Sequence, residues 1–210
     1  MILRGRTDVH HHFTPAEYLA FTAAHPGVGG FGRGGGRGRG AGRGSAGLGS
    51  ALPGWKLEED LEDMDKNGTA TAVLSITTPG FWFGSVEEVR KVSRECNDAA
   101  AKLRSDHPGR FGIFSMLPLP DIDGSLREIE YGFDTLKGDG VYMFTNWGGK
   151  ALYCDQYLGD PALAPICEEL NRRKAVVYNT HPKDPAYCHD SLRGVNGATS
   201  SNRWIPPGRS

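Results

Sequence analysis

Three consecutive histidines near the start of the chain, His10, His11 and His12, have a spacing that could bind a metal ion. Side chains alternate between the two faces of a β-strand, so His10 and His12 point to one face and His11 to the other. Two imidazoles on one side of a strand end can hold one Zn²⁺ or another divalent metal. Asp8 could orient one of the metal-binding histidines without binding the metal itself. The alternatives are an exposed polar cluster for the histidines and an ordinary strand-end residue for Asp8.

Two further polar segments follow predicted strands. Thr145-Asn146-Trp147 follows a strand predicted at 140–146, and His181-Pro182 follows one predicted at 175–180. In barrels of parallel strands the carboxyl ends of the strands form the active-site face. We therefore expect His181 to approach the pair of histidines on the first strand. Trp82 and Trp147 could line a substrate pocket there, with buried packing as the alternative for both.

The elements that must position these residues are short apolar strands that alternate with helices. Ser85 and Glu88 have the spacing of a helix capping box, and Asp160 precedes Pro161 as a helix start. Strand–helix alternation indicates right-handed βαβ units and a parallel sheet. Besides the strand that leads into the histidines, strands are predicted at 71–77, 111–117, 140–146 and 175–180, and helices at 57–67, 85–105, 123–137 and 161–173.

The order of these elements predicts an α/β fold, a TIM-type (β/α)8 barrel that is incomplete, with about five strand–helix units. A full barrel needs about 250 residues, and the chain has 210. A doubly wound sheet of five strands is the alternative by length. No GxGxxG motif opens a helix after the first strand, so a dinucleotide site is not expected.

A glycine- and arginine-rich segment at 27–53 is expected to be a flexible insertion, because it has almost no side chains to bury. The alternative is an RNA-binding segment. The net charge of −1 gives no electrostatic case for a nucleic-acid or membrane partner. No apolar run approaches the ~20 residues of a membrane-spanning helix. Four scattered cysteines without a CxxC pair favour reduced thiols and a cytoplasmic protein.

Several motifs resemble those of the amidohydrolase-related, metal-dependent decarboxylases. This group includes 2-amino-3-carboxymuconate-6-semialdehyde decarboxylase and the fungal 6-methylsalicylate decarboxylases. Apart from the segment at 27–53, the resemblance covers most of 1–188, and 189–210 is expected to be an irregular tail. The similar stretches include Asp-Val-His-His-His-Phe-Thr-Pro at 8–15, Leu-Ser-Ile-Thr-Thr-Pro-Gly at 74–80, His-Pro-Gly-Arg-Phe-Gly at 107–112 and Leu-Pro-Leu-Pro-Asp at 117–121.

The resemblance implies a TIM barrel, one divalent metal (usually zinc) and the non-oxidative loss of CO₂ from a small aromatic or related unsaturated carboxylic acid. It matches His10 and His12 to the HxH ligands of the family and His181 to the ligand after strand five. The family also uses a histidine after strand six and an aspartate after strand eight. This sequence is expected to lack both regions, as a member truncated at its carboxyl end, so no catalytic residue is assigned.

Two consequences and two alternatives follow from that resemblance. We expect weak or no activity, and aggregation or self-association that covers the open sheet edges. A metal-dependent hydrolase of the same fold is one alternative, since the same kind of site can activate water. A non-catalytic RNA-binding or interaction protein is the other.

Overall fold

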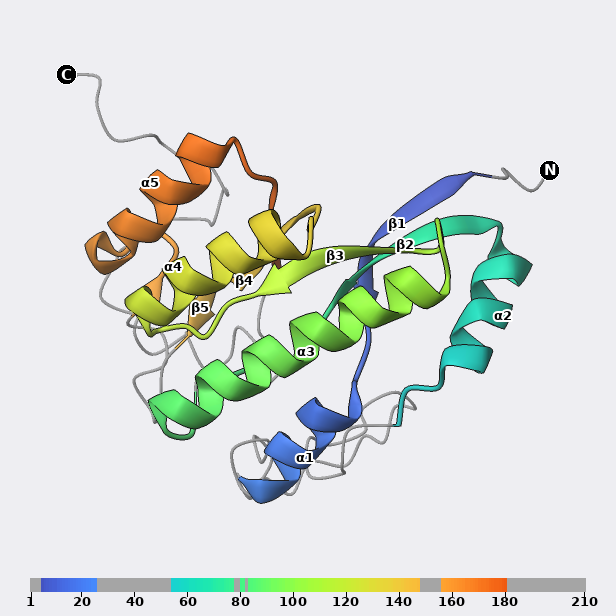
Figure 1. The fold of residues 1–210 in the computed structure, drawn as a ribbon, viewed down its shortest axis with the longest axis horizontal. Coiled ribbons are helices and arrows are strands. Elements are labelled where there is room, and N and C mark those ends of the chain that lie inside the picture. The colour runs from blue at the N-terminus through green and yellow to red at the C-terminus, as the bar shows by residue number, and fades with distance from the viewer. Residues whose placement is uncertain (1–4, 26–53, 78–79, 82, 148–155, 181–210) are drawn as a thin grey trace, which may run out of the picture.

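The fold is built on one parallel sheet, seen in a computed structural model that describes residues 5–25, 54–77, 80–81, 83–147 and 156–180. The order of its strands is β1-β2-β3-β4-β7, and every neighbouring pair is parallel (Figure 1). The strands are β1 (Arg6–His12), β2 (Thr69–Ser75), β3 (Phe111–Met116), β4 (Gly140–Phe144) and β7 (Val177–Thr180), and a separate antiparallel pair is formed by β5 (Asn146–Trp147) and β6 (Gln156–Tyr157).

The strand order confirms the predicted incomplete barrel. Each strand of the sheet lies beside the one that precedes it in the chain, as barrel strands do. A doubly wound sheet would instead reverse direction and place later strands on the other side of the first. That alternative is therefore wrong, and the expected number of about five strands is confirmed.

Within the described residues, five α-helices accompany the sheet, and Figure 1 shows α3 and α4 packed side by side across it. The predicted capping box is present, because the Ser85 side chain accepts a bond from the Glu88 amide and the Glu88 side chain accepts one from the Ser85 amide. Gly68 ends α2 with a left-handed φ of 70°. The helices are α1 (Ala16–Ala24), α2 (Leu57–Asn67), α3 (Val86–Asp106), α4 (Ile122–Glu130) and α5 (Ala164–Arg173).

The strand predicted at 140–146 ends at Phe144, with β5 separate from it, and the helices differ from the prediction in three places. Helix α1 was not predicted; it is only nine residues long, and its N-cap position is Pro15, which makes no side-chain cap bond. The helix expected at 123–137 ends at Glu130 and continues as a π-helical turn, Tyr131–Thr135. The helix expected at 161–173 begins with a 3₁₀ turn, Pro161–Leu163, before α5.

The core lies on both faces of the sheet because side chains alternate along each strand. On β4, Val141 and Met143 belong to the apolar cluster under α4 and α5. Tyr142 and Phe144, which alternate with them along the strand, pack with a second apolar cluster on the other face. Consequently the same strand supports a helix layer on one side and lines the inner face of the half-barrel on the other.

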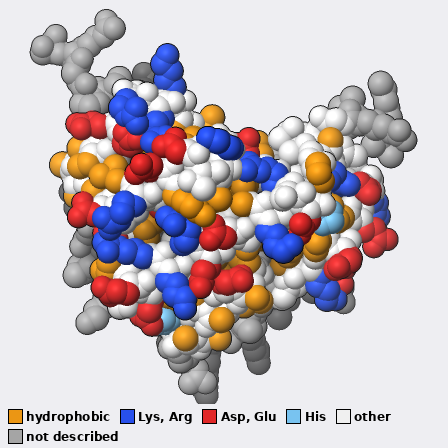
Figure 2. Space-filling view, viewed as in Figure 1, with side chains coloured by type: hydrophobic (Ala, Val, Ile, Leu, Met, Phe, Trp, Pro, Cys, Tyr) orange, Lys and Arg blue, Asp and Glu red, His pale blue; other side chains and the backbone are white. Residues whose placement is uncertain are grey.

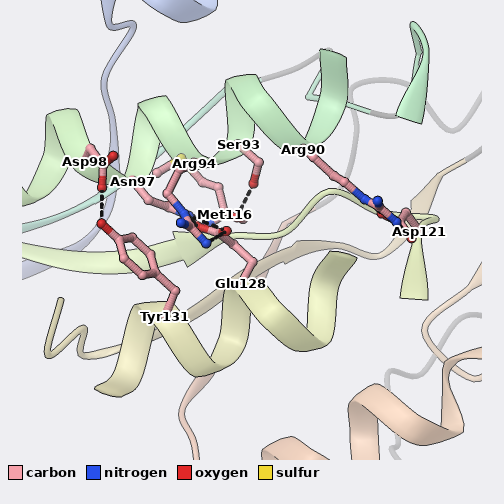
Figure 3. A network of polar contacts seen from close by, with 9 residues as sticks. All are labelled: Arg90, Ser93, Arg94, Asn97, Asp98, Met116, Asp121, Glu128 and Tyr131. Atoms are coloured by element: carbon pink, nitrogen blue, oxygen red, sulfur yellow. Dashed lines mark hydrogen bonds and ion pairs between the residues drawn. The ribbon is translucent and has the colours of Figure 1, made fainter. Parts of the chain in front are cut away.

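A buried polar network joins α3 to β3 and α4 (Figure 3). The Asn97 amide donates to the Met116 carbonyl at 3.0 Å and to Glu128 Oε1 at 2.8 Å, and its oxygen accepts from the Met116 amide at 2.8 Å. Ser93 also donates to the Met116 carbonyl, at 2.5 Å. Glu128, only 4% exposed, is paired with the guanidinium of Arg94. Each buried polar group of this network therefore has a partner, as burial requires.

The outer face over α3 and α4 has mixed charge. Figure 2 shows cationic and anionic side chains interspersed across it rather than gathered by sign. Arg90 of α3, for example, is paired with Asp121 at the start of α4. This face therefore lacks the one-sided basic character of a nucleic-acid surface.

Among the described residues, no helix has both the length and the apolar content needed to cross a membrane. The segments at 27–53 and 189–210 lie outside the described residues. The domain limits that were expected from the sequence stay predictions.

We expect Asn97→Ala to destabilise the fold more than Ser93→Ala. The first change leaves the buried Met116 amide without its acceptor, which costs about 1–3 kcal/mol, in addition to the lost bond to Glu128. The second leaves Asn97 still donating to the same carbonyl, so its cost is that of one bond, about 0.5–1.5 kcal/mol. Urea unfolding measures the loss in the free energy of unfolding for each of the two variants. An equal or larger loss in Ser93→Ala would contradict this account.

Candidate functional site

The candidate site begins with the histidine pair at the carboxyl end of β1. The ring centroids of His10 and His12 lie 4.9 Å apart at an interplanar angle of 78°, so the two imidazoles share one face, as the spacing predicts. Along β1, Asp8 pairs with Ala72 and His11 with Leu74, which leaves one extra residue on β1 between them. This β-bulge places Asp8 and His11 together on the other face.

The buried hydroxyl of Ser75 contacts both the backbone of His11 and the ring of His12. It donates to the His11 carbonyl at 3.2 Å and lies 2.8 Å from Nδ1 of His12. We assign the hydroxyl proton to the carbonyl, which can only accept, so that the hydroxyl accepts a hydrogen bond from His12 Nδ1–H. That leaves a lone pair on Nε2, the form of neutral imidazole that binds a metal.

The environment also keeps His12 neutral. Burial, reinforced by interaction with the neighbouring His10 and His11 rings, lowers the pKa of His12 to about 4. In the part of the chain that the structure describes, no residue hydrogen-bonds to Nε2 of His12 or to either ring nitrogen of His10. The pair therefore fits the donor chemistry of a divalent metal site, with two imidazole nitrogens free on the same face.

The third histidine is held on the opposite face by two carboxylates. Nε2 of His11 lies 2.9 Å and 3.0 Å from the two Asp60 oxygens on α2, and Nδ1 lies 3.2 Å from Asp8. These contacts, with the Asp60 hydrogen bond the largest, raise the pKa of His11. The carboxylate of Asp8 thus contacts the His11 ring rather than the rings of His10 and His12, and its other oxygen accepts from the His10 amide.

Aromatic side chains surround the pair on the inner face. Tyr178 of β7 lies 5.7 Å from His10 and Tyr142 of β4 lies 6.1 Å from His12, measured between ring centroids. Next to Tyr142, at the carboxyl ends of β2, β3 and β4, is a small apolar pocket with open space for about one water molecule. It is lined by Ile76, Phe81, Met116, Leu117, Leu119, Tyr142, Met143 and Phe144.

Sequence reasoning did not identify these lining residues, although a signal was present. Tyr142 and Phe144 alternate with aliphatic residues on β4, and Tyr178 pairs with Tyr142 in register. Aromatic residues that recur with a period of two lie on one face of the strand. This pattern indicates that the two faces of the strand pack against different surroundings. Without knowing which face met the helices, the pattern could not be assigned to a pocket.

The remaining predicted site residues are placed as follows. His181 and Trp82 lie outside the described residues. The backbone of Trp147 lies in β5, which pairs with β6. Within the described ranges, no three histidine, cysteine or carboxylate side chains come together as a complete metal site. The structure thus brings together two of the three proposed ligands, and the third stays a prediction.

The sequence of the chain is similar to those of known proteins. The family model described as amidohydrolase matches residues 7–193. A decarboxylase, yanB, from Aspergillus niger is 40% identical over 187 residues, which are 86% of this chain and 44% of the relative. The 6-methylsalicylic acid decarboxylase acuB from Aspergillus aculeatus is 37% identical, over 89% of this chain and 51% of the relative. The chain thus spans about half the length of these curated relatives.

A solved structure shares the fold. The 5-carboxyvanillate decarboxylase of Novosphingobium aromaticivorans superposes with a TM-score of 0.66 at 21% identity, over 93% of this chain and 57% of that one. That protein was solved with bound manganese and a nitrobenzoic acid compound. The likeness agrees with the parallel strand order described above.

We expect Gly80→Ala to destabilise the chain more than Gly109→Ala. Both glycines have a φ of 81°, which costs an alanine about 1–2 kcal/mol. A Cβ at Gly109 meets nothing within 4 Å, whereas one at Gly80 overlaps the ring of Phe144 in the pocket wall. Overpacking adds about 1–3 kcal/mol. Thermal or urea unfolding compares the variants, and equal losses would show that Phe144 does not confine position 80.

Proposed function

This chain belongs to the amidohydrolase family, and on that premise we propose that its strand ends bind a divalent metal and serve the decarboxylation of an aromatic carboxylic acid. One observation carries the proposal: His10 and His12 present free ring nitrogens beside a pocket lined by apolar and aromatic side chains. The nitrogens suit a metal, and the apolar and aromatic side chains nearby suit contact with the ring of a substrate.

The relatives support decarboxylation over the alternatives. Four curated relatives at 36–40% identity are all named decarboxylases, two of them of 6-methylsalicylic acid. Hydrolysis by the same kind of site has no comparable support. The RNA-binding alternative depends on the segment at 27–53, which lies outside the described residues, and the mixed charge of the α3–α4 face does not favour it.

Each part of the site has a distinct role in this proposal. A bound divalent metal supplies stabilisation of the negative charge that develops on substrate oxygens. His10 and His12 hold it through their ring nitrogens, with His181 as the proposed third ligand. The apolar and aromatic side chains that line the pocket would contact the aromatic ring of the substrate. Trp82 and Trp147 are proposed as further substrate contacts.

We propose zinc as the metal, because two imidazoles on a strand end suit it. The manganese of the Novosphingobium relative makes manganese the competing choice. Cytoplasmic location, self-association and weak activity stay predictions from the sequence. The proposed partner is a small aromatic carboxylic acid.

Purified full-length chain should contain about one metal ion per chain, and His10→Ala/His12→Ala should contain almost none, since each loss removes one of the few strong ligands. Elemental analysis after expression in medium supplied with zinc and manganese measures the amount and identifies the ion. His107→Ala, a histidine at the end of α3, serves as the control for general histidine loss. Metal retained by the double variant would contradict the proposed ligands.

Metal-loaded chain should release CO₂ from 6-methylsalicylate, and the double variant should not. Release of labelled CO₂ from a carboxyl-labelled substrate measures this directly. Chain that holds one metal per molecule but releases no CO₂ from 6-methylsalicylate or 5-carboxyvanillate would overturn the proposed reaction while leaving the metal site intact.

A further inference from the structure

We propose that Asp60, on helix α2, is a positioning residue that sets the orientation and the protonated nitrogen of His12 through His11 and Ser75. This inference rests on the proposed function, in which His12 is a metal ligand. It assigns a role to the middle histidine, which points away from the candidate site. It also assigns a role to a carboxylate that is 49 positions away from that histidine in the sequence.

The first step is the pair of carboxylate contacts that hold the His11 ring. Asp60 lies within 3.0 Å of Nε2 with both oxygens, and Asp8 lies 3.2 Å from Nδ1. The side chains of His11 and Asp60 are only 17% and 13% exposed, so water screens their interaction weakly. Both ring nitrogens are engaged, and the ring has no freedom to turn without breaking a contact. His11 is therefore fixed to α2 on one side and to the bulge of β1 on the other.

The second step leads from the His11 backbone to His12. The His11 carbonyl accepts a hydrogen bond from the Ser75 hydroxyl at 3.2 Å, and the oxygen of that hydroxyl lies 2.8 Å from His12 Nδ1, the nitrogen assigned as its donor. If the His11 backbone shifts or rotates, the hydroxyl loses the acceptor that directs its proton. Ser75 could then donate to Nδ1 instead, and the proton of His12 would move to Nε2, the nitrogen proposed to bind the metal.

The direct test is the protonation pattern of the His12 ring in metal-free, full-length chain. ¹⁵N NMR of labelled histidine at neutral pH distinguishes Nδ1–H from Nε2–H. We expect Nδ1–H in the wild type and a mixture, or Nε2–H, in Asp60→Ala and in Ser75→Ala. Asp60→Asn keeps an acceptor oxygen and should restore much of the wild-type pattern. Asp63→Ala, an exposed aspartate on the same helix, is the matched control and should match the wild type.

The second readout is metal affinity. Co²⁺ alone, titrated while its visible absorption is followed, should bind Asp60→Ala about 10- to 100-fold more weakly than the wild type, the usual cost of removing a partner that orients a metal-bound histidine. The shape of the absorption band should change as well, because it reports ligand geometry. Asp63→Ala should keep both the affinity and the band.

The outcomes separate this inference from the proposed function. Wild-type chain that binds no Co²⁺ removes the metal role, whereas the NMR pattern still decides whether Asp60 controls His12. An Nδ1–H pattern unchanged in Asp60→Ala overturns the inference. If Asp60→Ala does not fold, Ser75→Ala decides: retention of Nδ1–H there overturns it, and loss of Nδ1–H together with a normal pattern in Asp63→Ala supports it.

Discussion

The register between β1 and β2 is the constraint on which the candidate site depends. His12 lies opposite Ser75 and His11 opposite Leu74. A shift of one residue would exchange the faces of all three histidines, because side chains alternate strictly along a strand. The extra residue in β1 adjusts this register locally, so that Asp8 faces outward with His11. The arrangement of free nitrogens on one side and carboxylates on the other follows from this one pairing.

The layer of helices does more than cover the sheet. Polar side chains from two helices make hydrogen bonds or ion pairs with groups on the strands: Asp60 of α2 with the His11 ring, and Asn97 of α3 with the backbone of Met116. Neither Asp60 nor Asn97 lines the pocket. Both hold groups of the strands in place, because buried polar contacts are costly to break and allow few alternative geometries.

The sequence predicted the fold well where the signals were local. The capping box of Ser85 and Glu88, the helix end at Gly68 and the five strands follow from short-range patterns. The pairing of His10 with His12 on one face was predicted for the same reason, since strand alternation is local. The Asp60–His11 contact and the pocket wall around Phe144 could not be predicted, because each joins residues that are far apart in the chain. The short helix α1 was missed because it carries no capping signal.

The bonding of Met116 has a consequence for motion at the pocket. Its side chain lines the pocket, while its amide and carbonyl are held by residues of α3. The amide hydrogen can therefore exchange with solvent only when α3 separates from the sheet or Asn97 swings away. Such openings are rare in a packed layer. This part of the pocket wall is accordingly held by two buried side chains of α3, whereas Val9 on β1 is 48% exposed to solvent.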